Sequence, residues 1–198
     1  PLAVHRLGHG RPVILLHGLF SSAEVNWIKY GHAAQLAAAG FEAIMPDLRA
    51  HGQSAAPHDP AAYPADVLVR DLEAVIAALG IGDFDLVGFS LGARTSARAV
   101  TMGLTPRNLV LAGMGLEGLS QWGRRLDFFL DVIDRFGTIE RGDPAFFAQA
   151  FMKTMKVDPL AARLLLQAVH GCEGPDLARL TMPTLVVCGA DDQDNGSA

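Results

Sequence analysis

A serine stands between two glycines in the stretch "FDLVGFSLGA", residues 84–93, after an apolar run and before an alanine-rich segment. The spacing Gly88-x-Ser90-x-Gly92 is typical of a sharp strand-to-helix turn that presents a nucleophile. Such a turn strains its central residue, and side chains on the neighbours would clash with the adjoining strand and helix, so glycine is favoured there. The free N–H groups of the helix N-terminus would stabilise an oxyanion. Ser90 is therefore the candidate nucleophile.

Two other polar turns follow apolar runs. "VILLHGLF" ends in His17 and Gly18, where a chain reversal would aim backbone N–H groups at the same point as the serine. "MPDLRAHGQS", residues 45–54, passes from an apolar run through Asp47 into a polar loop. We expect His17 to pack behind the first turn as a structural residue, and His51 to hydrogen-bond within the second loop.

These turns need a sheet to position them. Apolar runs that suit buried strands end in Gly, Pro or Asp, and segments with helical periodicity separate them. The alternation of strand and helix implies right-handed crossovers. The predicted fold class is α/β, with a mostly parallel open sheet and helices on both faces. The expected strands are residues 12–18, 41–47, 84–90, 107–113 and 183–189.

Three helices are expected between the strands. Residues 64–80 carry apolar side chains on one face and end at Gly80, and residues 25–40 end at Gly40. Residues 92–104 follow the third strand directly.

The segment 114–175 breaks this alternation. It holds Trp122 and six of the ten phenylalanines, and its periodicity predicts several helices. We expect a small helical cap insertion that packs on its own core, with some aromatic side chains as the roof of a ligand pocket. The core of the sheet with its covering helices would then comprise residues 1–113 and 176–198, and the cap residues 114–175.

Composition excludes several function classes. The chain has 198 residues, a net charge of −5 and no basic stripe, so nucleic acid is not an expected partner. No apolar run approaches the ~18 residues of a membrane span, and the first residues show no signal-peptide pattern. Two cysteines, Cys172 and Cys188, make no disulfide framework, so a reducing cytoplasm is the expected location.

Four motifs occur together in one order along the chain: "LLHGLF", "PDLRAHGQS", "VGFSLGA" and "MPTLVVCGADD". With them the chain resembles the α/β-hydrolase fold family, and in particular its small esterase, enol-lactonase and cofactor-free haloperoxidase-like branch. The resemblance covers essentially the whole chain and is weakest in residues 114–175. One departure is Ala50, where that branch usually has glycine, although Gly52 remains.

The resemblance implies roles for individual positions. Ser90 would be the nucleophile, and the backbone N–H groups of Leu91 and Leu19 would form the oxyanion hole. No metal or organic cofactor is implied. The expected pocket residues are Phe20, Phe89 and Trp122.

Asp192, three residues past the glycine of the last predicted strand, would be the acid of a catalytic triad. Asp191 and Asp194 are near alternatives, and Glu117 is a remote one. In this family the histidine base follows the acid, but the six residues after Asp192 include no histidine. His170 precedes the acid and is the one histidine of the chain that could swing over a pocket.

This gap predicts a truncated chain. The family would continue beyond Ala198 with a helix, an edge strand and a loop that carries the histidine, and its first strand is largely absent from the N-terminus. Without the final strand, residues 183–189 would expose an unpaired sheet edge.

We therefore expect a serine hydrolase that cleaves a small or medium-sized apolar ester or lactone through an acyl-enzyme intermediate. The alternative is a non-catalytic scaffold of the same fold that binds a small hydrophobic ligand or a partner chain, because the sequence shows no usable base. Esterase, lactonase, peroxidase-like and C–C hydrolase chemistry share this constellation, and fold resemblance does not choose among them. The oligomeric state is open.

Overall fold

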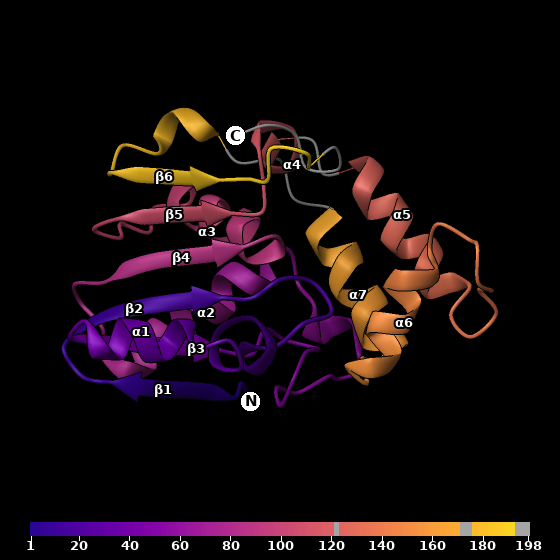
Figure 1. Ribbon diagram of the computed structural model, residues 1–198, viewed down its shortest axis with the longest axis horizontal. Coiled ribbons are helices and arrows are strands. Elements are labelled where there is room, and N and C mark those ends of the chain that lie inside the picture. Colours follow the sequence, from indigo (N-terminus) through magenta and orange to yellow (C-terminus); the bar gives the residue numbers. More distant parts are fainter. Residues whose placement is uncertain (121–122, 171–175, 193–198) are drawn as a thin grey trace.

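The computed structural model describes residues 1–120, 123–170 and 176–192. A sheet of six strands runs through the molecule in the order β1-β3-β2-β4-β5-β6 (Figure 1). β1 is antiparallel to β3, and the other neighbours are parallel. The strands are β1 (Val4–Gly8), β2 (Arg11–Leu16), β3 (Phe41–Pro46), β4 (Asp85–Phe89), β5 (Leu109–Ala112) and β6 (Thr184–Val187).

The parallel strands confirm the predicted fold class. All five predicted strands form, each shorter than its apolar run because the last residues turn into loops. β1 was not predicted. Its sequence shows no strand pattern, because the segment is polar and three of its five residues are exposed. Its register is set by pairing with β3 and not by an apolar run of its own.

Helices cover both faces of the sheet. α1 (His32–Ala38) packs on one face, over Val13, Leu15 and Met45. α2 (Val67–Leu79) and α3 (Leu91–Thr101) cover the other, over Ile14 and Leu86. The apolar face of α2 matches the face that this helix buries, whereas α3 is buried on nearly all sides.

One predicted helix is interrupted. Residues 25–40 were expected to form one helix ending at Gly40, but they divide into a π-helical turn, η1 (Glu24–Ile28), and α1. Gly31 separates them with φ 81°, a left-handed conformation that a continuous helix does not contain.

Between β5 and β6 lie α4 (Leu116–Ser120), α5 (Gly123–Asp134), α6 (Phe146–Thr154) and α7 (Pro159–His170). The short 3-10 turns η2 (Pro60–Ala62) and η3 (Leu177–Arg179) lie in loops. In Figure 1, α5, α6 and α7 stand at the carboxyl ends of the parallel strands. The sequence led us to expect that these helices would pack on a core of their own. Instead, Leu126 and Leu165 belong to the same buried cluster as Leu16.

The sheet is covered unevenly. The face under α2 and α3 is buried as far as Leu111 of β5. β6 is exposed along its whole length, with Leu185 57% and Val187 48% exposed. No described strand pairs with the outer edge of β6, in agreement with the open sheet edge predicted from the sequence.

Candidate active site

Ser90 connects the end of β4 to the start of α3. Its backbone has φ 53° and ψ −115°, an uncommon conformation for a residue with a side chain, which costs on the order of 1–3 kcal/mol. Its N–H donates to the carbonyl oxygen of Ala112 at 2.8 Å, and its own carbonyl accepts the N–H of Arg94 at 3.1 Å. β5 and the first turn of α3 therefore hold the strained residue in place.

The glycines around Ser90 are required by close packing. A Cβ atom on Gly88 would overlap the carbonyl oxygen of Gly92, and one on Gly92 would overlap the carbonyl oxygen of Leu16. Real Cβ atoms do not tolerate such contacts with backbone atoms, so a side chain at either position would force strand and helix apart. The turn thus has the steric form that its sequence predicted.

The turn after β2 lies directly beside Ser90. A Cβ atom on Gly18 would come within 3.3 Å of the serine Cβ. The amide of Leu19 has no hydrogen-bond acceptor among the described residues, and neither does the amide of Leu91, because the first N–H group of a helix has no intrahelical partner. These are the two amides expected to bind an oxyanion.

Two buried histidines lie behind this turn, with ring centroids 5.3 Å apart. His17 accepts the N–H of Leu48 at Nε2, at 2.9 Å, so its proton is on Nδ1, which donates to the carbonyl of Gly18 at 2.8 Å. Burial, with a smaller contribution from His51, lowers the pKa of His17 to about 3. Both ring nitrogens of His17 are bonded to backbone groups, so this histidine is structural and does not serve Ser90 as a base.

Two further side chains support the turn, and the sequence alone assigned neither of them a role. Asn26 of η1 accepts the N–H of Gly18 at Oδ1, at 2.9 Å. The buried carboxylate of Asp47 accepts the N–H groups of Ala23 and Gln53, both at 2.8 Å, and so ties the two loops together. A single sequence does not indicate that Asn26 supports the turn. An aspartate at the end of a strand, before a polar loop that contains glycine, does indicate such a role.

Asp192 lies in the turn after β6, where its N–H donates to the carbonyl of Gly189 at 3.1 Å. The thiol of Cys188 donates to Asp192 Oδ2 at 3.6 Å. Desolvation and the neighbouring carboxylate raise the pKa of this thiol. β6 is separated from the Ser90 strand by β5 alone, so both side chains lie at the carboxyl edge of the sheet.

The expected pocket residues have different surroundings. The ring of Phe20 is buried and meets Phe129 of α5 edge to face, with centroids 5.5 Å apart. Phe89 is 39% exposed, and its ring lies over Gly113, where a Cβ atom would come within 2.6 Å of it. Trp122 lies outside the described residues, so its prediction stays untested.

The histidine base is not identified among the described side chains. No hydrogen bond joins a described histidine to Ser90, and the side chain of His170 lies outside the described part of the chain. Within the described ranges there is also no group of three His, Cys, Asp or Glu side chains arranged to hold a metal ion.

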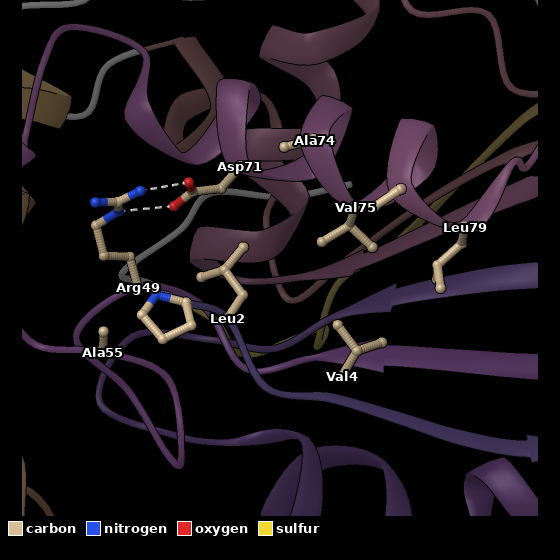
Figure 2. Close-up of a pocket in the computed structure, with 10 residues that line it drawn as sticks. Leu2, Val4, Arg49, Ala55, Asp71, Ala74, Val75 and Leu79 are labelled. Carbon is tan, nitrogen blue, oxygen red and sulfur yellow. Dashed lines mark hydrogen bonds and ion pairs between the residues drawn. The ribbon is translucent and has the colours of Figure 1, made fainter.

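A cavity of about 360 Å³ opens elsewhere, between the N-terminal segment and α2. Figure 2 shows Leu2, Val4, Val75 and Leu79 around it. Arg49 and Asp71 form a bidentate ion pair at one end, so neither is available to a ligand of opposite charge. None of its lining residues belongs to the Ser90 site, so this cavity is not the candidate active site.

Comparison with known proteins matches residues 11–136 to the family model described as alpha/beta hydrolase fold. N-formylmaleamate deformylase of Pseudomonas putida is 30% identical over 175 residues, which cover 87% of this chain and 62% of that protein. The chain therefore spans less than two thirds of that relative's length.

Solved structures agree on the fold. An enol-lactonase from Burkholderia xenovorans superposes with a TM-score of 0.67 at 18% identity, over 96% of this chain and 78% of its own. The esterase EaEST from Exiguobacterium antarcticum gives a TM-score of 0.63 at 22% identity, over 93% of this chain and 75% of its own. The chain belongs to the α/β-hydrolase fold family.

Proposed function

We propose that the protein is a serine hydrolase that cleaves small or medium-sized apolar esters or lactones through an acyl-enzyme on Ser90. The observation that carries the proposal is the strained backbone of Ser90 beside two amides without acceptors, those of Leu19 and Leu91. A strained serine at a helix N-terminus is the arrangement that acyl transfer needs. The names of the relatives, an esterase and an enol-lactonase among them, support the same class of bond.

In the proposed reaction Ser90 Oγ attacks the substrate carbonyl carbon while a histidine base takes the hydroxyl proton. The carbonyl oxygen becomes an oxyanion held by the N–H groups of Leu19 and Leu91, each worth about 3 to 4 kcal/mol. Collapse breaks the C–O bond, and the histidine returns the proton to the leaving oxygen. Water then repeats the sequence on the acyl-enzyme. Asp192 would orient the histidine.

An apolar substrate is favoured by the side chains near the turn. The ring of Phe89 is 39% exposed next to the serine and can pack against an apolar acyl chain. A charged acyl group would lose part of its hydration against that ring.

The proposal is tested by exposing the protein to a fluorophosphonate and mapping the adduct by mass spectrometry. Ser90 should be labelled, and p-nitrophenyl butyrate should be hydrolysed faster than a p-nitrophenyl ester with a charged acyl chain. Ser90→Ala is the control that removes both signals. Labelling elsewhere, or esterase activity that survives Ser90→Ala, would rule out the proposal.

A non-catalytic scaffold that binds a small hydrophobic ligand is the second candidate. It is favoured by one observation: both ring nitrogens of each buried histidine near the turn, His17 and His51, are bonded to backbone groups. Saturable binding of an apolar ester with neither turnover nor adduct would support this candidate. None of the helices in the described part of the chain has the length and hydropathy for a bilayer crossing.

A further inference from the structure

The turn of residues 18–21 has four consecutive backbone N–H groups, and the protein itself accepts three of them. Gly18 donates to Asn26 Oδ1 at 2.9 Å, and Ser21 donates to the carbonyl of Gly18 at 3.2 Å. The amide of Leu19 has no acceptor among the described residues. The fourth amide, that of Phe20, is taken by a histidine. Among the described residues, the turn therefore has one amide without an acceptor, that of Leu19. The acceptors of the other three amides determine which amide this is.

The acceptor of the Phe20 amide is Nε2 of His51, at 2.9 Å. Since an N–H group can only donate, Nε2 is unprotonated, and the ring proton lies on Nδ1, which donates to the carbonyl of Arg49 at 2.8 Å. The neutral ring thus links the loop after β3 to the turn after β2. Phe20 is held at φ 59°, a conformation that a residue with a bulky side chain rarely adopts. The strained residue is therefore fixed by the histidine.

The surroundings keep this ring neutral. His51 is 2% exposed, and burial lowers its pKa against the opposing influence of the Asp47 carboxylate. The other titratable groups on this side are His17, itself neutral, and His5, whose Nε2 lies 3.4 Å from Asp47 Oδ2. A proton on Nε2 would place two donors against each other and expel the Phe20 amide.

We propose that His51 is a positioning residue of the oxyanion hole, which binds the Phe20 amide so that the Leu19 amide alone faces the carbonyl oxygen of the substrate. This inference rests on the proposed function of Ser90. It assigns a task to a buried imidazole that takes no part in proton transfer.

The ring state is tested without catalysis, by long-range ¹H–¹⁵N correlation spectra of the histidine rings between pH 7.5 and pH 5. The expected result is a neutral His51 with its proton on Nδ1 at pH 7.5, a pKa of this ring below the ordinary histidine value, and loss of the Phe20 amide bond in His51→Phe. Protonation of His51 near the ordinary value, or a proton on Nε2, would overturn the inference. His9 is exposed and lies outside this site, so His9→Gln is the matched control variant for the kinetic measurements that follow.

The positioning role is tested by the rate of Ser90 phosphonylation and by kcat for p-nitrophenyl butyrate. His51→Phe should lower both by about 100-fold with KM within about twofold, because a misplaced donor is lost from the transition state. His51→Gln should restore most of the rate, because its amide can accept from Phe20 and donate to the carbonyl of Arg49. His9→Gln should leave the rates unchanged.

The outcomes are separable. Equal losses in His51→Gln and His51→Phe, both folded by circular dichroism, would indicate a packing role and overturn the inference, as would no loss in either. A wild-type Ser90 that fails to react would overturn the proposed function and the positioning role with it. The ring spectra would still decide whether the hydrogen bond to Phe20 exists.

Discussion

The turns that carry the proposed nucleophile and the proposed acid are built in opposite ways. The Ser90 turn is enclosed by β5, α3 and the turn after β2, and its glycines leave no room for a methyl group. The Asp192 turn follows β6, whose side chains are exposed, and among the described residues a Cβ atom on Gly189 would meet Asp192 alone, at 3.7 Å. The proposed nucleophile is thus positioned by backbone sterics, and the proposed acid by a short turn at an open edge.

The largest expected effect is a loss of activity, which should be greater for a substitution in the Ser90 turn than for one in the Asp192 turn. Ser90→Ala should lower kcat for a p-nitrophenyl ester by about 10⁶-fold, because the covalent route is lost, whereas Asp192→Asn should cost about 10⁴-fold. Steady-state kinetics of both variants, with Asp191→Asn as the matched control, provide the measurement. A greater loss in Asp191→Asn than in Asp192→Asn would move the acid to the neighbouring residue.

The second effect compares the same substitution in the two turns. Gly92→Ala should destabilise the fold by more than about 4 kcal/mol, because the new methyl group overlaps the carbonyl oxygen of Leu16. Gly189→Ala should change stability by less than about 1 kcal/mol, because its nearest neighbours are at ordinary contact distance. Urea unfolding followed by circular dichroism measures both. Similar losses in the two variants would contradict the contrast.

The third effect extends the contrast to the strands. Leu111 of β5 is fully buried, and Leu111→Ala should cost about 2 to 5 kcal/mol. Leu185 of β6 is 57% exposed, and Leu185→Ala should cost less than about 0.5 kcal/mol. Unfolding midpoints in urea give the comparison. A large loss in Leu185→Ala would mean that β6 is covered in solution.

The smallest effect concerns the buried histidine behind the enclosed turn. The pKa of His17 is about 3 in the folded protein, below its ordinary value of 6.5, so the unfolded chain binds the proton first. Stability should therefore fall as the pH drops from 6.5 towards 3, by about 2 kcal/mol from this group between pH 7 and pH 5.

Urea unfolding at pH 7, 6 and 5 measures this slope. His17→Gln should flatten it, even though the variant is less stable at pH 7. An unaltered slope in His17→Gln would show that the pKa of this ring is not lowered on folding.

The features around the Ser90 turn also differ in how far they could be predicted from the sequence. The Ser90 turn was predicted in detail because its requirement is local: a serine between two glycines after an apolar run determines strand, turn and helix together. The roles of Asn26 and of the His51 ring were beyond reach, because each depends on a hydrogen bond between loops that are distant along the chain.

The cap segment shows the same limit. Its helices follow from periodicity, but the sequence does not say that Leu126 and Leu165 join the core of the sheet instead of forming their own. β1 was missed for a related reason, because a polar strand acquires its register only from its neighbour β3.

By itself, the sequence determined the α/β class, the alternation of strands and helices and the serine turn between two glycines, since hydrophobic periodicity and turn residues are patterns among residues close in the chain. The tertiary structure alone decided which amide of the turn after β2 remains free. That choice depends on a neutral, buried imidazole from another loop, and burial is a property of the folded molecule, which no single stretch of sequence contains.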